Sequence, residues 1–180
     1  MRRGQRVAVL PSGLSTRVSE IRLGDTQLDE AFCPQSVTVV LEDDLDVSRG
    51  DMIIGLEDRP GAATDLRARV CWMRRQPLRS GVRFLLKHTS LTTPAVVAGI
   101  EHRLDMATLE PAPAPPELEL NDLGEIRLRT ARPIVFDAYA TNRLMGSFIL
   151  IEEGTNATVA AGMLVPPTEV APLADAGYTI

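Results

Sequence analysis

The sequence predicts an all-β protein of two small domains, each a barrel or a sandwich. Short apolar runs recur at close spacing along the 180 residues, and several alternate with polar residues at a period of two. The breaks between the runs carry the Gly, Pro, Asp and Ser that turns require. A hydrophobic content of 44% and a mean hydropathy of +0.02 are ordinary for a globular chain, so a sizeable core is available.

Charge divides the chain into two parts. Residues 1–60 carry 7 basic and 11 acidic side chains, whereas residues 61–150 carry 12 and 9. The net charge changes sign at 57–65, where a Pro-Gly pair and two alanines are typical of a linker. We therefore expect domains at 1–58 and 64–166, followed by a flexible tail at 167–180.

In the first domain we expect strands at 6–10, 16–23, 36–41 and 52–56. The stretches PSG, GDTQLDE and EDDLDVSRGD separate them as turns. The acidic run 41–51 has enough carboxylates for calcium, but Gly50 stands at the wrong place for a DxDxDG loop that ends in glutamate. We expect a solvated turn there.

In the second domain, alternation over 66–73 and 82–86 puts apolar side chains on one face of a strand. After Gly124, Ile126 and Leu128 are expected in the core, with Glu125, Arg127 and Arg129 on a wet face. Residues 146–153 and 157–165 supply two more apolar runs.

Two further segments are less regular. Residues 93–104 fit a helix or a strand, and the β-branched Val96, Val97 and Ile100 favour a strand. The proline-rich segment 111–117 predicts an extended loop, because proline cannot donate to a ladder. A proline-rich recognition segment is the alternative, but no basic anchor surrounds it.

Cys33 and Cys71 both lie in apolar runs, where a free thiol behaves as a small hydrophobe. The apolar run 7–10 is too short for the core of a signal peptide, and no span approaches the roughly 20 apolar residues of a membrane helix. We expect a cytoplasmic protein that has no disulfide framework and does not contact membranes.

No motif in the sequence points to catalysis or to a bound cofactor. There is no GxxxxGK loop for phosphate, and no GxSxG elbow for a nucleophile. DRPG at 58–61 matches the loose DxxG pattern of GTPases, but no phosphate loop precedes it, and NRLM at 142–145 fails the NKxD pattern. His88 and His102 lack further ligands at the spacing of a zinc site. We expect no catalytic, cofactor-binding or metal-binding residue, and no binding of GTP by this chain.

One basic cluster stands out, formed by Arg74, Arg75, Arg79 and Arg83 beside Trp72. It fits a solvated hairpin end, or a contact for a phosphate or an acidic partner. Nucleic acid is a poor candidate, because the net charge is −5 and only 4% of the residues are aromatic.

Taken in order, seven blocks of the sequence resemble the two carboxyl-terminal β-barrels of the GTPase (large) subunit of bacterial sulfate adenylyltransferase. That subunit belongs to the class of translation elongation factors, and the resemblance covers residues 3–164. The blocks are LDEAFCPQSVTVVLEDDLDVSRGDMI, ARVCWM, PLRSGVRFLLKHTS, HRLDMATLE, LNDLGEIRL, RPIVFDAY and NRLMGSFILIEEGTNATVAAGML.

The resemblance implies two small β-barrels of translation-factor type, the first truncated at its N-terminus. In the family, a GTPase domain and the opening strands of the first barrel come before this region. The large subunit couples GTP hydrolysis to the small catalytic subunit, which makes adenylylsulfate and pyrophosphate from ATP and sulfate. The resemblance therefore implies a non-catalytic coupling role, with the GTPase domain and the small subunit as partners, and with GTP and magnesium bound only in the full-length family.

A barrel without its first strands exposes unpaired edges, so we expect a homodimer, a swapped strand or a loosely folded first domain. The alternative to the coupling role is a free-standing β-barrel interaction module. Such a module would use the face from Arg74 to Arg83 for an acidic or phosphorylated ligand.

Overall fold

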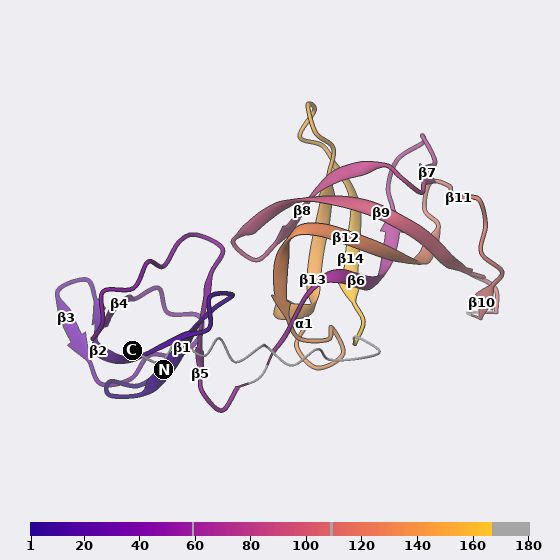
Figure 1. The fold of residues 1–180 in the computed structure, drawn as a ribbon. Coiled ribbons are helices and arrows are strands. Elements are labelled where there is room, and N and C mark those ends of the chain that lie inside the picture. The colour runs from indigo at the N-terminus through magenta and orange to yellow at the C-terminus, as the bar shows by residue number, and fades with distance from the viewer. Residues whose placement is uncertain (59, 109, 167–180) are drawn as a thin grey trace. The chain divides into compact units, whose positions relative to one another are not determined.

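The computed structural model describes residues 1–58, 60–108 and 110–166, which form two compact units, 1–58 and 60–166. Figure 1 shows both as β structures. The flexible tail expected at 167–180 lies outside the described residues. No described helix is long and apolar enough to cross a membrane.

Unit 1 is a curled half-barrel. Its strands are β1 (Arg6–Leu10), β2 (Leu14–Leu23), β3 (Thr26–Leu28), β4 (Thr38–Leu41) and β5 (Met52–Gly55). The sheet runs β3-β2-β1-β5, and β4 pairs with β2 as well. A small core of Val7, Val18, Ile21 and Ala31 lies inside the curl, and half-buried side chains from β4 and β5 pack against it.

Two expectations for unit 1 were wrong. β3 lies in the stretch predicted as a turn, because only Gly24 and Asp25 are needed to reverse the chain before Thr26 pairs with Leu23. Cys33 is exposed rather than buried. Its apolar run is a tight loop, in which the Gln35 amide donates to the Phe32 carbonyl at 2.9 Å, and no strand carries Cys33 into the core.

Unit 2 is a closed barrel of six antiparallel strands, in the order β9-β12-β6-β14-β13-β8 and back to β9. Figure 1 shows the long strands wrapping around one core. The elements are β6 (Gly61–Trp72), β7 (Leu78–Arg79), β8 (Arg83–His88), β9 (Leu91–Leu104), β10 (Pro111–Ala112), β11 (Glu117–Leu118), β12 (Leu123–Phe136), α1 (Arg143–Gly146), β13 (Ser147–Ile151) and β14 (Thr158–Leu164).

The core of unit 2 follows the alternation of the sequence. Leu66, Ala68, Val70 and Trp72 of β6 are all buried. The Trp72 ring meets the Phe84 ring edge-on with centroids 5.7 Å apart, and its indole Nε1 donates to the Gln76 carbonyl at 2.8 Å. The one polar atom of Trp72, the largest side chain in this core, therefore has a hydrogen-bond partner.

Three segments of unit 2 test the sequence predictions. Residues 93–104 are a strand, as expected. The linker prediction is wrong beyond residue 60, because β6 already begins at Gly61, which pairs with Phe136. The loop prediction for 111–117 is wrong at Pro111 and Ala112, which pair with the end of β9, and at Glu117, which pairs with Arg79. Proline is tolerated in β10 because β10 is an edge strand.

Candidate interaction surfaces

The predicted arginine cluster lies at one end of the barrel, where two of its four members are already paired. Arg74 forms an ion pair with Glu152, and Arg79 Nε donates to Glu117 Oε2 at 2.7 Å. The hydrogen bond from Arg74 holds the pKa of Glu152 below its ordinary value. Arg75 and Arg83 are exposed, and neither forms an ion pair within the described residues. Within this cluster, Arg75 and Arg83 are the members that the described carboxylates leave without an ion pair.

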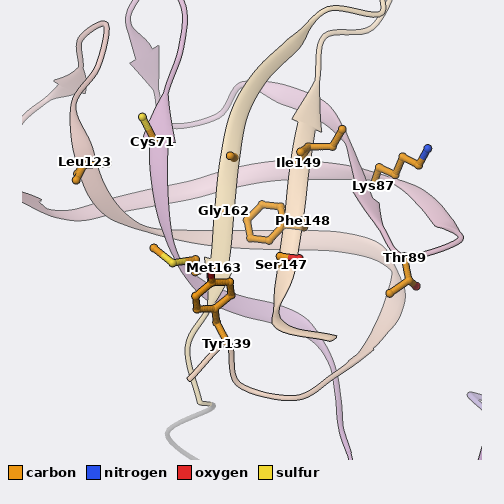
Figure 2. A pocket seen from close by; sticks show the side chains of 11 residues that line it. Cys71, Lys87, Thr89, Leu123, Tyr139, Ser147, Phe148, Ile149, Gly162 and Met163 are labelled. Atoms are coloured by element: carbon orange, nitrogen blue, oxygen red, sulfur yellow. The ribbon is translucent and has the colours of Figure 1, made fainter. Parts of the chain in front are cut away.

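A second surface is apolar and lies on the outer face of the barrel. A shallow hollow of about 540 Å³ runs over β6, β14, β13 and β8. Figure 2 shows Cys71, Ile149 and Met163 among its lining residues, together with Tyr139 and Lys87. The strand register explains the grouping, because Cys71 lies opposite Ala161 and Ala161 lies opposite Ile149. Side chains opposite one another on neighbouring strands share a face.

This outer hollow is mainly apolar and partly exposed, which makes it a candidate contact surface. Met163 is 37% exposed, and Ile149, Ala161 and Cys71 are partly exposed. The outer faces of β6 and β12 next to it carry arginines and carboxylates instead. An apolar patch within a charged outer surface is a candidate interaction site.

The charged part of the outer face centres on Glu125 of β12. We expected this carboxylate on a wet face, but its side chain is only 5% exposed. Arg67 pairs with it closely, Arg69 Nε lies 3.6 Å away and His102 Nε2 lies 3.8 Å away. The prediction failed because the alternation places Glu125 correctly on the outer face but cannot show that long neighbouring side chains cover it.

A second charge pair on the same face remains more open. Arg127 binds Asp65 through both its Nε and its Nη2, at 2.7 and 2.8 Å. This two-pronged hydrogen bond lowers the pKa of Asp65 and raises that of Arg127. Asp65 is 39% exposed, so the pair is a surface pair.

The two histidines have structural surroundings. His88 is buried in the barrel, and its Nε2 lies 2.8 Å from the Met145 carbonyl oxygen, so neutral His88 carries its proton on Nε2. Burial lowers the pKa of His88. His102 faces Glu125. Among the described residues there is no group of three or more His, Cys, Asp and Glu side chains that could hold a metal ion.

The two segments compared with GTPase motifs take part in the fold at residues that the structure describes. Asn142 begins α1, where its Oδ1 accepts from the Met145 amide and its Nδ2 donates to Asp137. Gly61, the last residue of DRPG, is paired within β6.

A second hollow belongs to unit 1. It measures about 520 Å³ and lies between β4, the acidic loop that follows β4, and Ile53 of β5. Val39, Leu41, Leu45 and Val47 form its apolar lining, and Glu42, Asp43 and Asp44 its acidic lining. Sequence reasoning predicted the acidic turn but not the apolar hollow beside it.

Comparison with known proteins decides the family. Residues 65–165 match the family described as GTP-eEF1A C-terminal domain-like. The chain belongs to this family. The match spans the barrel of unit 2 from the middle of β6 to the end of β14.

Similar sequences extend over most of both units. The bifunctional enzyme CysN/CysC of Rhodopirellula baltica is 42% identical over 165 residues, which cover 92% of this chain and 25% of that protein. The bifunctional enzyme CysN/CysC of Mycobacterium tuberculosis is 44% identical, covering 92% of this chain and 27% of that protein. Sulfate adenylyltransferase subunit 1 of Alteromonas mediterranea is 39% identical, covering 90% and 34%. The chain thus spans between a quarter and about a third of these relatives' length.

A crystal structure of Sup35 complexed with GDP has the same fold. Its TM-score is 0.84 at 20% identity, and the alignment covers 94% of this chain and 42% of that chain. The resemblance noted in the sequence, to the sulfate adenylyltransferase GTPase subunit and to translation factors, is confirmed.

Proposed function

We propose that the chain is the non-catalytic barrel region of a sulfate adenylyltransferase subunit 1. In this role it couples a GTPase domain to the small catalytic subunit that makes adenylylsulfate from ATP and sulfate, and it works in the cytoplasm. The observation that carries the proposal is the similarity, at 39% identity over 90% of this chain, to a protein named sulfate adenylyltransferase subunit 1. GTP and magnesium would be bound by the other part of that subunit.

The barrel of unit 2 suits a coupling role physically. A closed barrel has no free edge and moves as one rigid element, so a contact on one face can bias a contact on another. The apolar outer hollow around Ile149 and Met163 provides a contact face of the required kind. We assign this hollow to the small catalytic subunit.

The test is calorimetric titration of the chain with the small catalytic subunit. A carboxylate in the hollow should weaken binding about ten-fold or more, because an unpaired charge would be desolvated at the contact. The variant is Met163→Glu, and the control is Val82→Glu, which places the same charge at an apolar residue of similar exposure, 40% against 37%, outside the hollow. Absence of binding by the unaltered chain would refute the proposed function. Equal losses in both variants would refute only the assignment of the hollow.

The rival function is a free-standing interaction module that binds an acidic or phosphorylated ligand. Since Arg74 and Arg79 are already paired, this ligand would depend on Arg75 and Arg83. Charge reversal of both should then abolish capture of an acidic ligand and leave binding of the catalytic subunit unchanged. If the variant still captures the acidic ligand and no longer binds the catalytic subunit, the result supports the coupling role.

A further inference from the structure

The outer hollow of unit 2 lies where small side chains stand next to one another on neighbouring strands. Cys71 of β6 lies opposite Ala161 of β14, and Ala161 lies opposite Ile149 of β13. Figure 2 shows Gly162 and Met163 following along β14, with Ile149 on the strand beside them. The floor of the hollow is therefore made of small residues, and the larger Ile149 and Met163 stand on either side of it.

The strands beneath the hollow offer no free edge to a partner. Each of β6, β8, β13 and β14 pairs with a neighbour on both sides, and the family match at 65–165 spans this barrel. The main-chain amides and carbonyls of these strands are used within the barrel, so a partner cannot add a strand here. Recognition at the hollow must therefore come from side chains that fill the space over its small residues.

Charge favours an acidic partner at this hollow. Among the described residues that line it, Lys87 is the one charged side chain. Lys87 lies opposite Ile149, is exposed, and forms no ion pair within the part of the chain that the structure describes. Arg69, opposite Met163, is 66% exposed, whereas its partner Glu125 is only 5% exposed. A carboxylate that approaches the hollow thus meets two exposed cations.

We propose that the outer hollow is a socket for a segment of the small catalytic subunit that presents large apolar side chains and, beside them, a carboxylate. The apolar side chains rest on Cys71 and Ala161 between Ile149 and Met163, and the carboxylate pairs with Lys87. The small residues select the partner by shape, and Lys87 selects it by charge. This inference rests on the proposed function and deepens it, because it gives the chemistry of the partner surface.

Ala161→Phe tests the shape of the socket. We expect this variant of the full chain to bind the small catalytic subunit about ten-fold or more weakly in calorimetric titration, because the added ring occupies the space of the partner's side chains. The control is Ala98→Phe in β9, which adds the same ring at an exposed residue outside the hollow and should leave the affinity unchanged. Thermal unfolding of both variants checks that the barrel is intact.

Substitutions of Lys87 test the charge. Lys87→Glu should weaken binding of the small catalytic subunit about ten-fold or more, and Lys87→Arg should retain the affinity within about two-fold. The control is Arg83→Glu, which reverses the charge of another exposed residue of β8 that does not line the hollow. Between about 0.05 and about 0.5 M salt, the affinity of the unaltered chain should fall more steeply than that of Lys87→Gln.

The outcomes separate this inference from the proposed function. Absence of binding by the unaltered chain would refute the proposed function and the inference with it. If the unaltered chain binds, equal affinities of Lys87→Glu and Arg83→Glu would overturn the acidic partner surface, and equal affinities of Ala161→Phe and Ala98→Phe would overturn the socket. The proposed function would stand in both cases.

A different occupant would also be recognised. If Ala161→Phe and Lys87→Glu leave binding of the small catalytic subunit unchanged but lower the thermal stability of intact subunit 1, the GTPase domain covers the hollow, and the inference is wrong.

Discussion

At the scale of single residues, Glu125 is the clearest example of a buried charge in this molecule. Its carboxylate is almost fully covered, while the arginines that cover it remain partly exposed, Arg67 at 40% and Arg69 at 66%. Removal of its negative charge takes away the carboxylate that Arg67, Arg69 and His102 share, although Arg67 keeps its ion pair with Glu101. Burying a charge is costly unless it is paired, so the carboxylate depends on the arginines that cover it.

Glu125→Gln should lower the free energy of unfolding of unit 2 by about 1–3 kcal/mol, because the neutral amide cannot balance the cations around it. Denaturant unfolding followed by the fluorescence of Trp72, the one tryptophan of the chain, measures this change. The control is Asp65→Asn, which breaks the more exposed pair with Arg127 and should cost no more than about 1 kcal/mol. Equal losses of unfolding free energy in the two variants would contradict the conclusion that burial makes the Glu125 charge matter more than the Asp65 charge.

His88 gives the barrel a dependence on pH. Its pKa is lowered by burial in the folded chain, so the unfolded chain binds the proton more readily. The contribution of neutral His88 to stability is complete above the unfolded pKa of about 6.5, and is lost as the pH falls below that value toward the folded pKa.

His88→Gln keeps a donor for the Met145 carbonyl and removes the titration. Between pH 7.5 and 5, we expect the free energy of unfolding of the unaltered chain to fall more steeply than that of the variant, by at most about 1.4 kcal/mol per pH unit. Parallel curves for the two proteins would show that His88 does not titrate on unfolding.

At the scale of elements, the sequence predicted strands well where their faces differ in polarity. The alternation of β6 from Leu66 to Trp72 and that of β12 at Ile126 and Leu128 appear in the structure as buried and exposed faces. The first residues of β6 are Gly, Ala, Ala and Thr, and they carry no such contrast. Their strand is imposed by pairing with residues 134–136, far along the chain, which local pattern cannot show. The outer hollow could not be predicted for the same reason, because strands that are distant in the sequence, β6, β8, β13 and β14, bring its lining together.

Gly162 in β14 shows how closely two strands of the barrel pack. A Cβ at this position would lie 2.2 Å from Cζ of Phe148, whose ring crosses the glycine from β13. Figure 2 shows the Phe148 ring beside Gly162. The missing side chain is therefore a requirement of the core packing.

Gly162→Ala should destabilise unit 2 by about 1–3 kcal/mol, because the Phe148 ring must move within a packed core. Shortening the ring partner in Gly162→Ala with Phe148→Leu should recover part of the loss, and a double-mutant cycle measures the coupling. The control, Gly99→Ala in β9, places its methyl group where no atom lies within 4 Å and should be neutral or slightly stabilising. A neutral Gly162→Ala would contradict the packing described.

At the scale of the whole molecule, the two units differ in how complete they are. Among the described residues, the core of unit 2 has twenty buried apolar residues and that of unit 1 has four. Unit 2 closes on itself, whereas within residues 1–58 β3, β4 and β5 each pair with a single strand. The all-β class and the resemblance to translation-factor barrels were accessible from the sequence. The closure of one barrel and the openness of the other were not visible in local patterns, because they depend on which distant strands pair.

The expected homodimer or swapped strand stays a prediction. The coupling role rests on the relatives and on the apolar outer face of unit 2. Both concern what this chain binds, since no residue assigned above has a part in chemistry.

The most direct test of the coupling role is competition in a reconstituted sulfate adenylyltransferase made of intact subunit 1 and the small catalytic subunit. If the barrel region docks on the small subunit, an excess of this chain should displace subunit 1. It should then abolish the GTP-dependent part of adenylylsulfate synthesis and leave any GTP-independent synthesis unchanged. Synthesis that stays fully dependent on GTP at saturating concentrations of the chain would contradict the account.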